Sequence, residues 1–125
     1  MIRERLARLR VKLDRCDPDV LGSWPCIQDC VVDAAVAFGA EAFDIRIWTN
    51  LRSGGVHCVA RIGRSSIRIA TRPREHSALA WLSTPWTTGG VNALRELCRG
   101  LGPRRIEVKS LGQDVEATAW TVMSP

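Results

Sequence analysis

The first sixteen residues carry apolar side chains at helical spacing. The apolar positions follow one another at intervals of four, three and four residues: Ile2, Leu6, Leu9 and Leu13. Arginines and a lysine occupy most of the positions between them, so the spacing places the apolar residues on one face of a basic helix. The pattern predicts an amphipathic helix over 2–15 that ends before Asp17-Pro18, with 1–22 as a candidate detachable arm.

A second helix is predicted just downstream. Ser23 stands where a helix N-cap is expected, Pro25 suits the first turn, and Gly39 suits the position after the last turn. Between them the apolar residues keep a helical period: Ile27, Cys30, Val31, Ala34 and Phe38.

The pattern then changes to strict alternation of apolar and polar residues. Segments 43–50, 56–62 and 66–72 alternate, and the linkers 51–55 and 63–65 have the length and residues of hairpin turns. We expect a three-stranded antiparallel meander. A short helix over 75–82, a helix near 90–100 that stops at Gly102-Pro103, and two strands over 105–110 and 114–122 complete the prediction. The expected fold is a single α+β domain over 1–125, in the order ααβββααββ, with the helices on one face of the sheet.

Alternation also divides the meander into two faces. One set is expected to face the helices: Ile45, Ile47, Val56, Cys58, Ala60, Ile62, Ile67 and Ile69. The other set is expected to face outward: Arg46, Trp48, His57, Val59, Arg61, Arg68, Ala70 and Arg72.

Composition and charge sharpen this picture. The chain has 125 residues, of which 46% are hydrophobic, and this excludes disordered and collagen-like classes. Its net charge of +5 is unevenly distributed: +4 over 1–16, −6 over 17–45, +7 over 46–74 and zero over 75–125. The segment of charge +7 contains no acidic residue and coincides with the predicted meander.

The outward face of the meander suggests a function in binding. Guanidinium groups neutralise phosphates, and aromatic rings stack on unpaired bases. We therefore hypothesise a non-catalytic module that engages RNA, DNA or a nucleoprotein complex through Arg46, Trp48, His57, Arg61, Arg68, Arg72 and Arg74.

Two alternatives remain open. The first is a protein–protein adaptor, inhibitor or assembly subunit, whose N-terminal helix docks on a partner or self-associates through Ile2, Leu6, Leu9, Leu13, Arg5 and Arg8. The second is a small enzyme that uses Cys98, His76 or Glu96. No motif assigns a catalytic residue, so an enzyme is the less favoured interpretation.

No metal or cofactor site is expected. Cys26 and Cys30 lie one helical turn apart, but a structural zinc site needs four ligands. Gly89-Gly90 precedes a helix without the lysine that completes a phosphate-binding loop. Five cysteines without a framework spacing, no secretory leader and no apolar stretch near 18 residues predict free thiols, a cytoplasmic location and no membrane partner.

The chain resembles two known families, and both resemblances include the three strands of the predicted meander. Residues 43–121 resemble a degenerate ribonuclease H-like core, in which Asn50 stands in place of the first metal-binding acid, Glu96 matches the second, and 110–112 lack the third. This resemblance implies the fold without its two-metal nuclease activity. Residues 26–82 are instead similar to a double-stranded RNA-binding domain, with 54–57 resembling its minor-groove segment and Arg72-Pro73-Arg74 standing near its lysine cluster.

Overall fold

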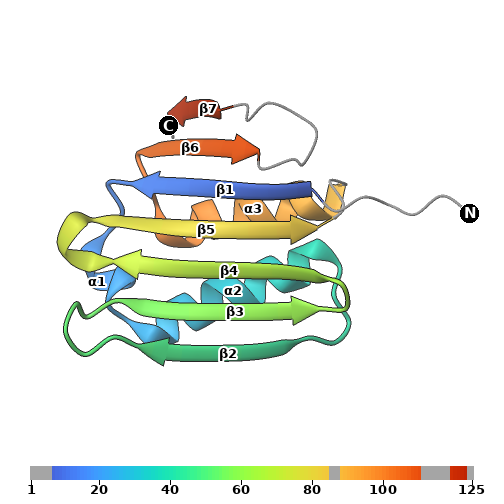
Figure 1. Cartoon of the computed structure of the whole chain (residues 1–125), viewed down its shortest axis with the longest axis horizontal. Helices are drawn as coiled ribbons and strands as arrows, with labels where there is room; N and C mark the ends of the chain where they lie inside the picture. Colours follow the sequence, from blue (N-terminus) through green and yellow to red (C-terminus); the bar gives the residue numbers. More distant parts are fainter. Residues whose placement is uncertain (1–6, 85–87, 111–118, 124–125) are drawn as a thin grey trace, which may run out of the picture.

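One antiparallel sheet of seven strands forms the framework of the computed structural model, which describes residues 7–84, 88–110 and 119–123 (Figure 1). The elements in chain order are β1 (Ala7–Asp14), α1 (Pro18–Leu21), α2 (Trp24–Phe38), β2 (Asp44–Thr49), β3 (Val56–Ile62), β4 (Ser65–Arg72), the 3-10 turn η1 (Pro73–Glu75), β5 (Ser77–Thr84), α3 (Thr88–Leu101), β6 (Arg105–Ser110) and β7 (Ala119–Met123). Helices α2 and α3 lie on one face of the sheet. The predicted α+β class is confirmed, whereas the predicted element order is not.

The strands follow the spatial order β2-β3-β4-β5-β1-β6-β7. Strands β2 to β5 form a meander in which each pairs with the next, and β1 lies between β5 and β6, antiparallel to both. The first strand of the chain is therefore a central strand of the sheet.

The predicted N-terminal helix is wrong where the structure describes it. Residues 7–14 form β1, whose Leu9, Val11 and Leu13 are buried while Arg8 and Arg10 are exposed. The segment carries helical spacing at Leu9 and Leu13 and period-two alternation at the same time, and pairing with strands on both sides selects the second pattern. Residues 2–6 of the predicted helix lie outside the described residues.

Helix α2 forms where the sequence predicted it. The Ser23 hydroxyl accepts a hydrogen bond from the Cys26 amide at 3.4 Å, and Gly39 ends the helix with a φ of 103°, a left-handed conformation that favours glycine. Its buried face contacts α3, because Gly100 of α3 lies directly against the Cys30 side chain, where a Cβ would collide. The two helices together cover the inner face of the sheet.

The second correction concerns residues 75–82, which were predicted as a helix. The structure has a 3-10 turn and then β5, in which Ala78, Ala80 and Leu82 are buried and Leu79 and Trp81 point to the opposite face. Alanine and leucine favour helices, but β5 pairs with β4 and β1 on either side and gains both sets of backbone hydrogen bonds.

The later elements agree better with the prediction. Helix α3 and strand β6 form at the expected places, and β7 covers part of the predicted strand 114–122. Residues 114–118 and the predicted turn at 111–113 lie outside the described residues.

All five cysteines are free. None of the helices in the described segments is long and apolar enough to cross a membrane.

The two faces of the meander are as the alternation predicted. On strands β3 and β4, Cys58, Ala60, Ile67 and Ile69 are fully buried toward the helices. Their neighbours in sequence occupy the opposite face, where the cross-strand pairs are Trp48 with His57, Val59 with Arg68, and Arg68 with Trp81. We call this second surface the open face of the sheet.

Candidate functional site

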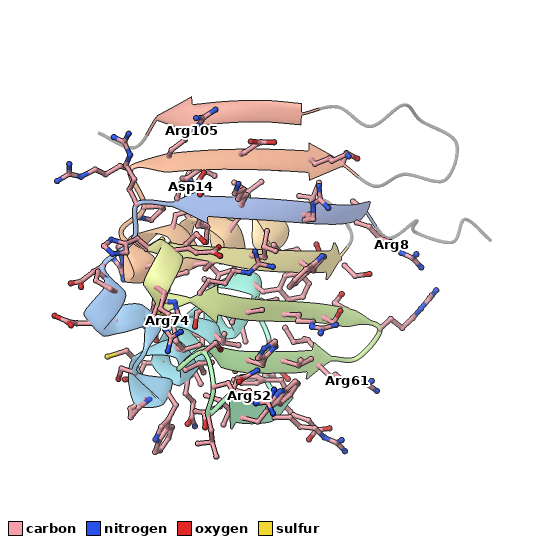
Figure 2. The ribbon with its side chains drawn as sticks, turned by 60° about the vertical axis from the view of Figure 1, so that its left-hand side comes forward. Arg8, Asp14, Arg52, Arg61, Arg74 and Arg105 are labelled. Atoms are coloured by element: carbon pink, nitrogen blue, oxygen red, sulfur yellow. The ribbon has the colours of Figure 1, made fainter. Side chains whose placement is uncertain are left out.

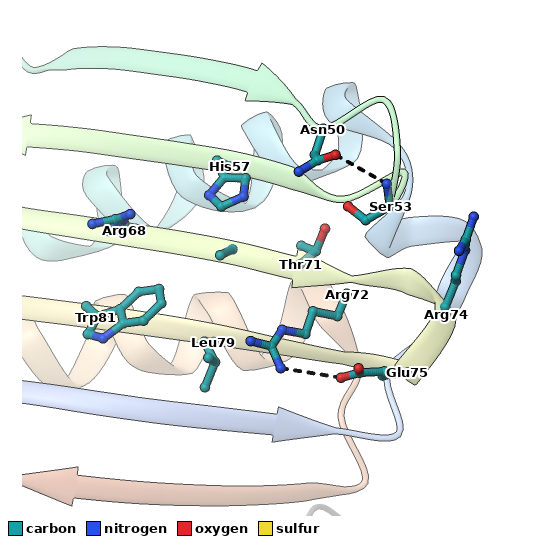
Figure 3. A pocket seen from close by; sticks show the side chains of 11 residues that line it. Asn50, Ser53, His57, Arg68, Thr71, Arg72, Arg74, Glu75, Leu79 and Trp81 are labelled. Atoms are coloured by element: carbon teal, nitrogen blue, oxygen red, sulfur yellow. Dashed lines mark hydrogen bonds and ion pairs between the residues drawn. The ribbon is translucent and has the colours of Figure 1, made fainter.

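A pocket of about 430 Å³ lies on the open face over strands β3, β4 and β5 (Figure 3). The loop between β2 and β3 and the turn η1 close one end of it. The residues that line it are Asn50, Ser53, His57, Arg68, Ala70, Thr71, Arg72, Arg74, Glu75, Leu79 and Trp81. We call this site the sheet-face pocket. Its volume lies in the range of small-molecule sites.

The loop over 50–55 forms a wall held by its own hydrogen bonds. The Asn50 side-chain oxygen accepts from the amides of Arg52 at 3.0 Å and Ser53 at 3.3 Å, and the Asn50 amide donates to the Gly55 carbonyl at 2.8 Å. The Arg74 guanidinium donates to the Arg52 carbonyl at 3.2 Å and ties η1 to this loop. The loop is therefore closed at its base and tied to η1 through its middle.

Thr71 anchors the sheet beneath that wall. Its buried hydroxyl accepts from the Val56 amide at 2.8 Å and donates to the Leu21 carbonyl at 2.7 Å, so it joins β4 to the start of β3 and to the end of α1. Gly55 lies against the Thr71 backbone carbonyl, since a Cβ at Gly55 would come within 2.5 Å of that oxygen. Only glycine permits this close approach.

Three guanidinium groups make the pocket positive. The Arg68 guanidinium lies over the Trp81 ring, 5.2 Å from its centroid, a cation–π contact. Arg72 forms an exposed ion pair with Glu75 at 3.5 Å, and Glu75 is the only carboxylate among the residues that line the pocket. The pocket is suited to an anionic group such as a carboxylate.

An aromatic stack lies beside these cations. The rings of Trp48 and His57 are 5.3 Å apart between centroids and 7° from parallel. The Nδ1 atom of His57 is buried without a hydrogen-bond partner, and burial, followed by the charge of Arg68, lowers the pKa of His57 below its ordinary value of 6.5. Imidazole is therefore neutral here at pH 7, and Nε2 is the nitrogen left to meet a ligand.

We expect His57 to make the folded protein less stable in acid. The unfolded chain takes up a proton at this residue near pH 6.5, whereas the folded chain does so only at lower pH, so the free energy of unfolding falls as the pH drops below 6.5. Urea denaturation from pH 7.5 to pH 5 should show a shallower pH dependence for His57→Gln than for the native chain. Identical slopes for the two proteins would contradict the lowered pKa.

The structure gathers the predicted binding residues on one face and divides them between two hollows. His57, Arg68, Arg72 and Arg74 line the sheet-face pocket. Arg46, Trp48 and Arg61 line a second hollow nearer to the edge strand β2. Figure 2 shows Arg61 at the opposite end of the sheet from Arg74.

Six lining residues were not anticipated: Asn50, Ser53, Thr71, Glu75, Leu79 and Trp81. Leu79 and Trp81 were missed because 75–82 was interpreted as a helix, and the unbroken apolar run 78–82 does not by its period distinguish a strand from a helix. Asn50, Ser53 and Glu75 reach the pocket only through the fold of the loop and of η1, for which no spacing in the sequence gave a signal, and Thr71 of β4 was expected to face the helices.

The remaining candidates do not assemble into a site. Burial raises the pKa of Cys98 to about 11, which leaves a poor nucleophile, and no hydrogen bond joins it to His76 in the described parts of the chain. Glu96 pairs with Arg99 at 3.0 Å. No cluster of three metal-binding side chains occurs among the described residues. Leu9 and Leu13, two of the helix-docking residues, belong to the buried core.

Comparison with known proteins identifies the family. Residues 7–113 match the sequence model of the S-adenosylmethionine decarboxylase family, so the chain belongs to this family. Its fold is similar to the crystal structure of the adenosylmethionine decarboxylase from Aquifex aeolicus VF5, with a TM-score of 0.77 and 15% sequence identity over 92% of this chain and 99% of that chain. A phage SAM lyase in complex with S-methyl-5'-thioadenosine aligns with a TM-score of 0.48 and 12% identity over 99% of this chain and 94% of that chain, a likeness too weak to carry an argument. None of the curated proteins matches the sequence.

These findings correct two expectations. Both resemblances drawn from the sequence, to a ribonuclease H-like core and to a double-stranded RNA-binding domain, are wrong, and each needs a helix after the third meander strand where the chain has β5. The hypothesis of a non-catalytic nucleic-acid-binding module is also wrong, because the family is one of enzymes. An arginine-rich face with an aromatic ring binds carboxylates as well as phosphates, and the residues alone did not separate these ligands.

Proposed function

We propose that this protein is an enzyme that binds S-adenosylmethionine, or a closely related sulfonium nucleoside, in the sheet-face pocket and acts on its amino-acid end. The family match over residues 7–113 carries the proposal, since it links the chain to proteins described as S-adenosylmethionine decarboxylases. The chemistry of the pocket supports it independently.

The substrate carboxylate fits the arginines of β4. Arg68 and Arg72 both project from this strand onto the open face, and each offers N–H groups in a planar fork that matches a carboxylate. Arg72 is held by an exposed ion pair with Glu75, which is worth little and is readily exchanged for a ligand. Arg68 is the better candidate because it has no carboxylate within ion-pair distance in the described residues.

The rest of the ligand fits the aromatic side chains. An adenine ring can stack on the Trp81 indole or at the Trp48–His57 pair, and neutral His57 can donate a hydrogen bond from Nε2 to a ring nitrogen. The sulfonium is cationic, so we expect it to lie away from Arg68 and near Glu75, where it would replace the Arg72 guanidinium as the partner of that carboxylate.

These residues bind and orient the substrate. Decarboxylation of an α-amino acid leaves an electron pair on the α-carbon, and enzymes delocalise such a pair into a carbonyl- or imine-containing group. In this proposal the pocket holds the carboxylate in place and thereby orients the bond between the α-carbon and the carboxylate, which breaks in the reaction.

Calorimetric titration with S-adenosylmethionine tests the proposal. We expect Arg68→Gln to weaken binding by about 10- to 100-fold, because a charge-assisted hydrogen bond contributes about 1.5–3 kcal/mol. Arg95→Gln, on the exposed side of α3, is the matched control and should bind normally. S-methyl-5'-thioadenosine lacks the carboxylate and should bind the native and Arg68→Gln proteins alike.

Release of labelled CO₂ from carboxyl-labelled S-adenosylmethionine tests the catalytic part. Turnover that falls in Arg68→Gln and persists in Arg95→Gln supports the assignment. Absence of binding, or equal affinity in Arg68→Gln and the native chain, would reject the pocket. Binding without any turnover would reject the enzymatic part.

A further inference from the structure

Two residues with a left-handed backbone line a second pocket, which shares no lining residue with the sheet-face pocket. Arg15 has a φ of 57° and His76 a φ of 54°, and these are the only non-glycine residues with positive φ among those described. In this conformation the Cβ atom is crowded by the backbone, so it disfavours any residue with a bulky side chain. Arg15 follows β1 and His76 follows η1, yet both line the same pocket.

Backbone hydrogen bonds hold the two residues together. The Cys16 amide, directly after Arg15, donates to the His76 carbonyl at 2.8 Å. The Arg104 amide donates to the Asp14 carbonyl at 3.0 Å, and this brings a third segment to the same place. Figure 1 shows that β1 ends and β5 begins at the same end of the sheet. The fold therefore fixes the main chain of all three segments.

The pocket collects positive charge. It has a volume of about 400 Å³ and is lined by Arg15, Cys16, Asp17, Pro18, His76, Gly102 and Arg104. Neither arginine lies within ion-pair distance of a carboxylate in the part of the chain that the structure describes. The Asp17 carboxylate, the one acidic group of the lining, accepts a hydrogen bond from the Asp19 amide at 2.9 Å and caps α1.

We propose that Arg15, His76 and Arg104 form a binding site for a compact oxyanion, a phosphate or carboxylate group carried by a ligand. Strained backbone at non-glycine residues persists where the surrounding structure fixes it, and such residues cluster at active and ligand-binding sites. Here both strained residues can donate hydrogen bonds to an anion, and Arg104 adds a third donor across the pocket. The site shares no residue with the sheet-face pocket, so it does not depend on the function proposed there.

Glycine substitutions separate binding from folding. Because glycine adopts a left-handed backbone without crowding, Arg15→Gly and His76→Gly should melt at the native temperature or up to about 5 °C higher in chloride buffer. The same variants should lose at least about tenfold in affinity for inorganic phosphate or malonate. Arg15→Asn, which tolerates this backbone and lacks the charge, should behave as Arg15→Gly does, while Arg95→Ala on α3 should bind as the native chain does.

Binding is measured by calorimetry and by the shift in melting temperature, at constant ionic strength set with chloride. If only phosphate binds saturably and raises the melting temperature, the site takes a phosphate-bearing ligand. If only malonate does so, the ligand carries a carboxylate. Three results would overturn the proposal: no saturable effect on the native chain, undiminished binding in Arg15→Gly and His76→Gly, or a large loss of stability in both glycine variants, which would make the two side chains structural.

Discussion

Val11→Asn is expected to destabilise the protein by about 3–5 kcal/mol, a large part of the stability of a small domain. Val11 is fully buried in the central strand β1, between β5 and β6. The substitution removes about 1.5–3 kcal/mol of apolar burial and leaves a side-chain amide without partners, at a cost of about 1–3 kcal/mol. Urea denaturation followed by circular dichroism gives the loss directly.

Lys12→Asn is the matched control, since it introduces the same side chain one position along the same strand. Lys12 is exposed on the open face, so its loss should cost less than about 1 kcal/mol, mostly through the lower strand propensity of asparagine. Comparison of Val11→Asn with Lys12→Asn also distinguishes a strand from a helix at residues 7–14. On the predicted N-terminal helix Val11 lies off the apolar seam, and Val11→Asn would be tolerated about as well as Lys12→Asn.

Thr71→Val is expected to cost about 2–4 kcal/mol although it preserves the shape of the side chain. The hydroxyl of Thr71 has two buried partners, the Val56 amide and the Leu21 carbonyl. Valine leaves both backbone groups without a hydrogen bond, and each unsatisfied buried group costs about 1–3 kcal/mol. Because these bonds join three elements at the end of the sheet-face pocket, ligand binding there should weaken along with stability.

Thr71→Ser provides the control for that loss. Serine keeps the hydroxyl and gives up one methyl group, so the expected cost is about 1 kcal/mol. In equilibrium unfolding, the free energy of unfolding of Thr71→Ser should therefore be close to that of the native chain, and that of Thr71→Val should be well below both. If Thr71→Val is as stable as Thr71→Ser, water must form the hydrogen bonds to the Val56 amide and the Leu21 carbonyl in place of the Thr71 hydroxyl.

Local features that depend on neighbouring residues were readable from the sequence. The cap at Ser23, the stop at Gly39 and the extent of α2 follow from hydrogen bonds and backbone angles set within a few positions. The two faces of the meander followed from alternation alone, because successive side chains of a strand point to opposite sides. The sequence by itself thus determined the arginine-rich open face.

The tertiary structure decided which of two local patterns each ambiguous segment adopts. Residues 7–14 carry helical and alternating signals together, and residues 78–82 are an apolar run that fits a helix or a strand. Pairing between β1 and β5, about seventy residues apart in sequence, stabilises the strands. Pairing between β4 and β5 placed Trp81 beside Arg68 and completed the sheet-face pocket. The pairing between β1 and β5 brought the ends of β1 and η1 together, where Arg15 and His76 line one pocket.

The kind of ligand was the point at which the sequence was least informative. Guanidinium groups accept phosphates and carboxylates alike, so the charge of +7 over residues 46–74 suggested a nucleic acid when the family is one of S-adenosylmethionine decarboxylases. Alternation determined which side chains share a surface. Only long-range strand pairing decided which of them enclose a pocket of small-molecule size, because contacts between distant segments are not encoded in any local period.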